Sequence, residues 1–391
     1  MRAALTIIAI WAAGLGAAAQ FGKISVAYEA LGRAYAAQAG IGIGVMVSIV
    51  GMVGLIFGTT AGLLVARIGA RRAMVGALAL GAAVSAVQML FPPYPVMMVS
   101  RLLEGVSHLV IVVVGPTVIA GLTAARWQGA VMTLWSSFFA VTYAALFFFG
   151  PPLVAASGPG ALFGLHALWM AACGGLLWAL LPADAREKAG ALAGSLWAEH
   201  RRIYASPWVA APATGFVCYT MTYVAVLTLL PAMMPDQGAF VGVAMPLVSI
   251  AVSLTFGVWL LGRMSAVHLV QAGFALAVLS GLGLWLGWGG PAAVVFALGV
   301  AGSLGIVQGA SFAALAQLNA TSEDRAQAAG AIAQLGNLGT TCGTPILVWL
   351  TERAGSLGLV LFVTGFSALG IAIHALQARR RALSVEPRRP R

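Results

Sequence analysis

A succession of long apolar runs constrains this chain more than any other feature of its sequence. Each run is close to the about 20 residues that an α-helix needs to cross a bilayer. Of the 391 residues, 61% are hydrophobic and 8% are charged, whereas soluble domains carry roughly 25% charged residues. Because backbone groups in lipid must be bonded within their own segment, we predict an all-α membrane protein with about twelve transmembrane helices. The runs cover residues 4–22, 40–66, 73–91, 96–121, 129–154, 160–181, 208–234, 240–262, 266–288, 291–317, 326–350 and 357–377.

The first run permits a second interpretation. Arg2, the apolar stretch after it and the three alanines at 17–19 are similar to a cleavable signal peptide. Cleavage would remove one span and upset the balance of charges between the loops.

The loop charges predict the orientation of the chain. When successive runs are assumed to cross the membrane in alternate directions, both termini fall on the same side. Nearly all of the 21 lysines and arginines fall on that side. In the opposite loops lie only Lys23, Arg33 and Arg353, and Arg101 lies within a span. Since positive loops stay inside, we expect both termini in the cytoplasm. The chain is compact and alanine-rich and lacks long outer loops, so we expect a bacterial inner membrane. We therefore interpret the net charge of +11 as a determinant of membrane orientation. No nucleic-acid partner is expected, because the basic residues are scattered through short loops and the tail.

The runs divide the chain into two halves. Residues 150–154 (GPPLV) resemble 343–347 (GTPIL), and 115–117 (GPT) parallel 309–311 (GAS), at similar offsets. Such repetition indicates a duplicated six-helix unit. We predict a first bundle at 1–181, a cytoplasmic linker with a helix on the lipid surface at 182–207, a second bundle at 208–378 and a basic cytoplasmic tail at 379–391.

Several function classes lack the motifs that they need. The chain has two lysines, Lys23 and Lys188, and neither belongs to a G-x-x-x-x-G-K-[ST] loop, so ATP binding by that route is excluded. No HExxH, no metal-ligand cluster and no G-x-S-x-G is present, and the three cysteines are isolated within apolar runs. We expect no enzyme, no cofactor and no metal.

Ionisable residues inside the fourth run are the main chemical feature of the sequence. Arg101, Glu104 and His108 share one helical face near the middle of the predicted span. Burial of such groups in a bilayer is costly, so they usually face a cavity or one another. We interpret Glu104 as a proton-coupling acid, Arg101 as its partner or as a counter-ion for substrate, and His108 as a group that shares the proton. A purely structural ion pair is the alternative.

The loop after the second run carries a family signature. Residues 62–72 read GLLVARIGARR, which resembles the G-x-x-x-D-R-x-G-R-R-like signature of the major facilitator superfamily. Ala66 stands where that family usually has an aspartate of the cytoplasmic charge network. The residues matching this gating motif are Gly62, Arg67, Gly69, Arg71 and Arg72.

Two further signatures support the resemblance. Arg101 and Gly105 match an arginine-glycine pair of span four, and Gly150–Pro151 matches part of an antiporter motif of span five, whose glycine pair is absent here. Over essentially its whole length the chain is identified as a member of this superfamily of secondary transporters. The resemblance implies two pseudo-symmetric six-helix bundles and alternating access.

The same resemblance implies that spans one, four, seven and ten line a central cavity. Their polar and aromatic side chains suit a small organic solute, and ordinary interhelical hydrogen bonds are the alternative. Besides Arg101 and His108, the candidate binding residues are Gln20, Tyr219, Thr222, Tyr223, Gln308, Ser311 and Phe312. A stripe of Gln334, Asn337 and Thr341 is interpreted as support for helix packing, and His166, His200, His268 and His374 as structural or interfacial. Lys23, Glu29 and Arg33 are placed in a solvated outer loop.

We therefore predict a monomeric secondary active transporter that moves a small organic solute, coupled to protons, with export favoured by Gly150–Pro151. An uptake carrier for a small organic anion, with Arg101 as counter-ion, is one alternative. A membrane receptor or assembly factor that retains the fold without transporting is another.

Overall fold

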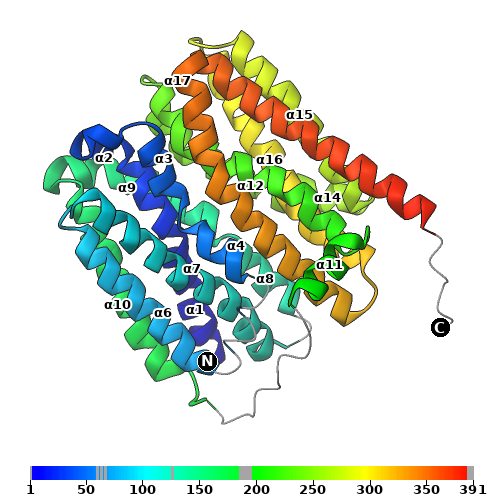
Figure 1. The fold of residues 1–391 in the computed structure, drawn as a ribbon, viewed down its shortest axis with the longest axis horizontal. Helices are drawn as coiled ribbons and strands as arrows, with labels where there is room; N and C mark the ends of the chain where they lie inside the picture. The colour runs from blue at the N-terminus through cyan, green and yellow to red at the C-terminus, as the bar shows by residue number, and fades with distance from the viewer. Residues whose placement is uncertain are drawn as a thin grey trace.

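A computed structural model of the chain describes residues 2–58, 61, 65, 68–124, 127–184 and 196–384. Within these residues the regular secondary structure is entirely helical, which confirms the predicted all-α class. In Figure 1 the helices up to α10 gather on the left and those from α12 onward on the right. The helices of the first half are α1 (Arg2–Val26), α2 (Tyr28–Ala34), η1 (Ala36–Gln38), α3 (Ile41–Ser48), α4 (Gly51–Phe57), α6 (Ala70–Gln88), α7 (Tyr94–Leu122), α8 (Gln128–Ser136), α9 (Phe138–Ser157) and α10 (Gly160–Leu180).

The second half begins with α11 and ends with a long helix. Its elements are α11 (Leu196–Ala205), α12 (Ala210–Met233), α13 (Gly238–Val252), the π-helix η3 (Ser253–Gly257), α14 (Val258–Leu261), α15 (Ala266–Leu286), α16 (Ala292–Leu318) and α17 (Ser322–Leu383).

Ten helices of the described chain are long and apolar enough to cross a membrane. The predicted span at 40–66 is instead broken into α3 and α4, each too short to be counted. α17 covers two predicted spans and changes direction at Gly355, whose φ of +53° a glycine adopts readily. The exact number of twelve spans therefore stays a prediction.

The helices of the first half pack around α1. It contacts α7, α9 and α10, and α6 lies between α7 and α10. Glycines permit close approach, as at Gly115, where a Cβ would lie 2.3 Å from the Trp135 ring. The predicted cleavage region of α1 is part of this core, since Ala17 and Ala18 are fully buried.

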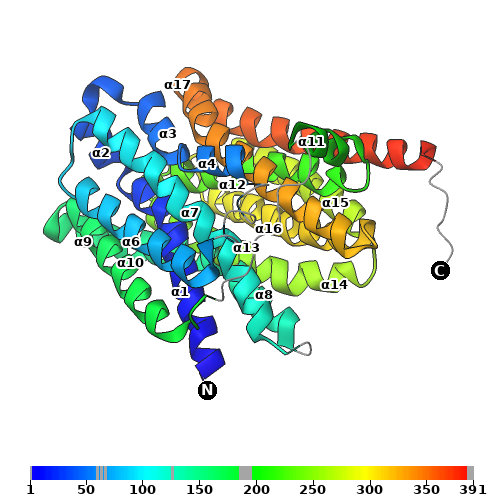
Figure 2. The ribbon, with the colours of Figure 1, turned by 60° about the horizontal axis from the view of Figure 1, so that its bottom comes forward.

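The second half is centred on α12, which packs along α17, and α15 lies against both α16 and α17. α11, within the predicted linker, packs on α12 and α17 rather than standing apart from the protein (Figures 1 and 2). Its Tyr204 hydroxyl donates to the Gln334 side chain at 2.8 Å, and burial raises the pKa of Tyr204 to about 12, so the donor is the neutral phenol. The tail beyond residue 384 and the linker residues 185–195 lie outside the described residues.

The two halves meet along a glycine-lined surface of α3 and α4. A Cβ on Gly51 would lie 2.5 Å from the Thr341 hydroxyl, and one on Gly54 would lie 2.3 Å from the Asn337 amide. The Gln334 amide also donates to the Leu55 carbonyl at 3.1 Å. The polar stripe of α17 thus packs against α3 and α4, in keeping with the packing role that the sequence indicates.

We expect Gly51→Leu to separate α4 from α17 and to lower the midpoint of thermal unfolding in detergent. Overpacking of a close contact costs about 1–3 kcal/mol. The matched control is Gly76→Leu on α6, where a Cβ meets nothing within 4 Å. Equal effects of the two substitutions would show that the glycine contact does not stabilise the fold.

Candidate functional site

Six side chains from four helices form what we call the buried charged cluster. Each is at most 5% exposed, although lysine, arginine and glutamate side chains are ordinarily charged in water. Glu104 is the one carboxylate among the buried polar residues of the described chain. The members are Lys23 of α1, Ser85 and Gln88 of α6, Arg101 and Glu104 of α7 and His166 of α10.

The carboxylate of Glu104 lies at the centre of this cluster. Its Oε1 accepts from the Lys23 ammonium and, at 3.3 Å, from the Ser85 hydroxyl. Its Oε2 accepts from the Arg101 guanidinium and, at 3.0 Å, from the Gln88 amide. Gln88 is the last residue of α6 and Lys23 lies in the last turn of α1, so the cluster lies toward one end of these two helices.

The break between α3 and α4 accounts for the position of Arg101. α3 ends at Ser48, so the carbonyls of its last turn are available to side-chain donors. Arg101 donates through Nε to the Met46 carbonyl at 2.9 Å and through Nη2 to the Val47 carbonyl at 3.1 Å. A cation at a helix C-terminus also complements the helix dipole.

Gly105 brings α7 close to the same break. A Cβ at this position would lie 2.5 Å from the Val50 carbonyl oxygen. The arginine-glycine pair of the fourth span thus has a local structural reason, because Arg101 bonds the end of α3 while Gly105 leaves room for the backbone.

Lys23 corrects the sequence interpretation. It lies in the last turn of α1 and is fully buried, not in a solvated loop. Its Nζ contacts Glu104, lies 2.5 Å from the Ser85 hydroxyl and lies 3.1 Å from Nδ1 of His166. Helix α1 continues to Val26, past the apolar run at 4–22. The sequence signal for this extension is that Gln20 and Lys23, three residues apart, fall on one helical face.

The sequence indicates no chemical role for His166, yet this residue belongs to the cluster. Its Nδ1 lies 2.6 Å from the Ser85 hydroxyl, and its Nε2 lies 2.9 Å from the Gly16 carbonyl. Because a carbonyl accepts only, Nε2 carries a proton and Nδ1 of the neutral ring is an acceptor. A single histidine in an apolar run gives no sequence signal for this arrangement.

His108 lies one helical turn from Glu104 on α7. The sequence predicts that these two residues share a proton. Its Nδ1 is 3.1 Å from the Ala17 carbonyl, and its ring meets Phe21 edge-on with centroids 5.1 Å apart. Gln20 is adjacent, where its amide donates to the Ser107 hydroxyl at 3.0 Å. The structure therefore brings Arg101 to Glu104 directly and leaves His108 outside the cluster.

The candidate binding residues of α12 and α16 lie apart from the cluster. Tyr219 and Tyr223 are buried and stack with centroids 5.2 Å apart. The Thr222 hydroxyl donates to the Cys218 carbonyl at 2.8 Å and the Ser311 hydroxyl to the Val307 carbonyl at 2.7 Å, so both bond their own helices.

The two remaining candidates of α16 differ in exposure. Gln308 is half-buried, and Phe312 is 49% exposed and packs on the Phe216 ring at 5.5 Å. This exposure argues against Phe312 as part of an enclosed site.

The last residues of the gating motif contact Asp184, which lies more than 100 residues away in the sequence. Gly62, Ala66 and Arg67 lie outside the described residues, but Gly69 precedes α6 with a φ of +94°. The Asp184 carboxylate accepts the backbone N–H groups of Arg71 at 2.9 Å and Arg72 at 3.0 Å. Asp184 thereby caps the start of α6 from a distant part of the chain.

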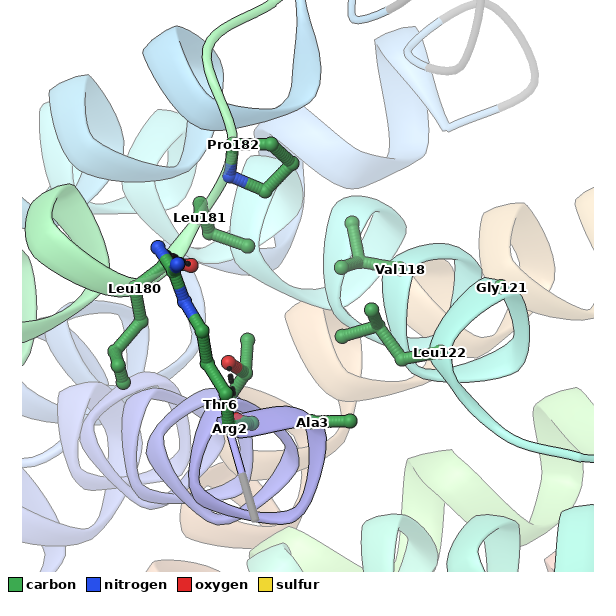
Figure 3. Close-up of a pocket in the computed structure, with 9 residues that line it drawn as sticks. All are labelled: Arg2, Ala3, Thr6, Val118, Gly121, Leu122, Leu180, Leu181 and Pro182. Atoms are coloured by element: carbon green, nitrogen blue, oxygen red, sulfur yellow. Dashed lines mark hydrogen bonds between the residues drawn. The ribbon is translucent and has the colours of Figure 1, made fainter.

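Two cavities border α1. One of about 490 Å³ lies at the start of α1, and Figure 3 shows the Arg2 side chain reaching toward Leu180 while Val118 and Leu122 face it. The other, of about 280 Å³, lies between α1, α9 and α10 and is lined mainly by apolar residues, with Lys23 and His166 in its wall. Neither is lined by the predicted residues of α12 or α16.

The long apolar helices define a polytopic membrane protein. The buried charged cluster indicates a functional site within it, because ionisable residues between membrane helices are usually functional. The Major Facilitator Superfamily model matches residues 6–344, which is most of the chain. The chain therefore belongs to the major facilitator superfamily of membrane transporters. A search of curated proteins found no match.

We expect Asp184→Ala to leave the first turn of α6 uncapped and to lower thermal stability. Loss of a helix N-cap acceptor costs about 0.5–2 kcal/mol. Thermal unfolding in detergent measures the change, and the control is Asp236→Ala, which removes an exposed carboxylate. An unchanged midpoint for Asp184→Ala would show that its contact does not stabilise α6.

Proposed function

We propose that this transporter is a secondary active carrier of a small organic solute, coupled to protons through the buried charged cluster. One observation carries the proposal: Lys23, Arg101 and Glu104 are fully buried among membrane helices. Ionisable groups at such a depth are costly and are typical of proton and substrate pathways. The bonds of the cluster join α1, α6, α7 and α10, so a change in its protonation acts on all four helices.

We propose alternating access between a bundle of residues 1–181 and a bundle of residues 208–378. Ser25 of α1 supports a coupled motion, because its hydroxyl lies 2.8 Å from that of Thr228 on α12 and 3.3 Å from that of Tyr143 on α9. We place the solute near Tyr219 and Tyr223, whose stacked rings suit an aromatic or partly polar molecule. Export, a bacterial inner membrane, cytoplasmic termini and a monomer complete the proposal.

A small organic anion is the second candidate substrate. The cluster contains two permanent or potential cations, Lys23 and Arg101, and one carboxylate, so it has a surplus of positive charge. Arg101 itself suits the role of counter-ion less well than the sequence indicates. Its guanidinium already donates to Glu104 and to the carbonyls of Gln20, Met46 and Val47.

The test is substrate-dependent proton movement in proteoliposomes that contain a pH-sensitive dye. Cationic drugs, aromatic acids and small organic anions are added to wild type and to Glu104→Gln. We expect one class to move protons in wild type and the signal to fall at least about ten-fold in the variant, as for loss of a group needed in the rate-determining step.

Glu29→Gln is the matched control, because Glu29 is an exposed glutamate paired only with Arg33 on the surface. It should transport like wild type. Equal coupling in Glu104→Gln would return Glu104 to a structural role. Absence of transport by folded wild-type protein across all three classes would favour a receptor or assembly factor.

A further inference from the structure

The charges of the buried cluster do not balance. Glu104 is the one buried carboxylate of the described chain, and it contacts both Lys23 and Arg101. His166 is neutral in the arrangement described above, because its Nδ1 faces the Lys23 ammonium as an acceptor. With Lys23 and Arg101 charged, the cluster thus contains one positive charge in excess, among side chains that are at most 5% exposed, where an unpaired charge is costly.

Loss of one proton from the cluster removes this excess. Arginine stays protonated in proteins, so Arg101 cannot release a proton. Protonation of Glu104 would leave two cations without a carboxylate and would increase the imbalance. Loss of a proton from Lys23 leaves one guanidinium paired with one carboxylate, and buried lysine is the cation that changes its protonation most readily.

The surroundings of Lys23 suit both of its protonation states. As an ammonium it has three acceptors within reach for its three protons: Glu104, the Ser85 hydroxyl and Nδ1 of His166. As a neutral amine it retains two donors and gains a lone pair, which the Ser85 hydroxyl, 2.5 Å away, can satisfy as a donor. In both states the Lys23 nitrogen has a partner for each of its protons and for its lone pair.

The other groups around Lys23 do not compete for this role. The ionisable side chains that face it are Arg101 and Glu104 from α7 and His166 from α10, whereas α6 contributes the uncharged Ser85 and Gln88. On α7, His108 is bonded to a carbonyl of α1 instead. On α9, the Tyr143 hydroxyl faces Ser25.

We propose that Lys23, and not Glu104, releases and rebinds the coupling proton, and that His166 is its immediate acceptor. The Nζ–H bond of Lys23 breaks and an Nδ1–H bond of His166 forms, which leaves a neutral amine and an imidazolium. The imidazolium then gives its Nδ1 proton to water that enters the cavity between α1, α9 and α10, whose wall contains His166, and the reverse sequence reloads the site. Glu104 remains ionised and is the positioning residue. This inference rests on the proposed proton-coupled transport.

The first test does not require a known substrate. The chain contains only two lysines, Lys23 and Lys188, so Lys188→Arg protein labelled with ¹³C,¹⁵N-lysine gives a single side-chain NMR signal. We expect this signal to change from the ammonium to the amine shift between about pH 6 and 9, the range in which groups that transfer protons in function titrate. A signal that keeps the ammonium shift over the whole range overturns the proposal.

The second test uses variants that fix the charge at position 23. Lys23→Arg keeps a cation that cannot lose its proton, and Lys23→Gln keeps a neutral donor. We expect both to retain exchange of labelled for unlabelled solute while pH-gradient-driven accumulation falls at least about ten-fold, because exchange needs no net proton transfer. Lys188→Arg, the matched control, should retain both activities.

The outcomes separate the two proposals. Accumulation that persists in Lys23→Gln overturns the role of Lys23 while leaving proton-coupled transport intact. Wild-type protein that exchanges solute but never responds to a pH gradient overturns the proposed coupling itself. A parallel loss of exchange and accumulation in the Gln variant, with an unchanged thermal midpoint, assigns Lys23 to solute binding and also contradicts the proton role.

Discussion

The carboxylate of Glu104 organises the first half of the molecule. It accepts from Lys23 of α1, from Arg101 of its own helix and from Gln88 of α6, while His166 of α10 completes the set through Lys23 and Ser85. In a low-dielectric interior an unpaired member of such a set would be far more costly than in water, so the helices that carry these groups must stay together. Polar contacts thus join four membrane helices to one carboxylate or to its immediate partners.

The position of Arg101 in this cluster depends in turn on the interruption between α3 and α4 in the second predicted span. A continuous helix there would bond its own carbonyls, whereas the break after Ser48 leaves those of Met46 and Val47 to Arg101. Gly105 lets the α7 backbone approach the break. The two carbonyls are acceptable in a membrane helix because the Arg101 side chain bonds them. Broken helices of this kind are typical of transporters, whose sites need backbone groups as well as side chains.

The two halves contact each other through uncharged groups, whereas the cluster is joined by ion pairs. Glycines of α4 pack on the polar stripe of α17, and hydroxyls of Ser25 and Thr228 meet between α1 and α12. A single neutral hydrogen bond between membrane helices contributes about 0.6 kcal/mol on average. Such contacts suit the alternating access that we propose for the two halves, and the buried charged cluster lies within the first half.

Local sequence determined the membrane class, the helical fold and the family, because length, hydrophobicity and short motifs are properties of contiguous residues. It also indicated Arg101 and Glu104 as partners, since three positions along a helix place them on one face. The sequence did not reveal that Lys23 and His166 join them or that Asp184 caps α6. Those contacts depend on the depth and rotation of each helix relative to its neighbours. An apolar run leaves both undetermined, and only tertiary packing decides them.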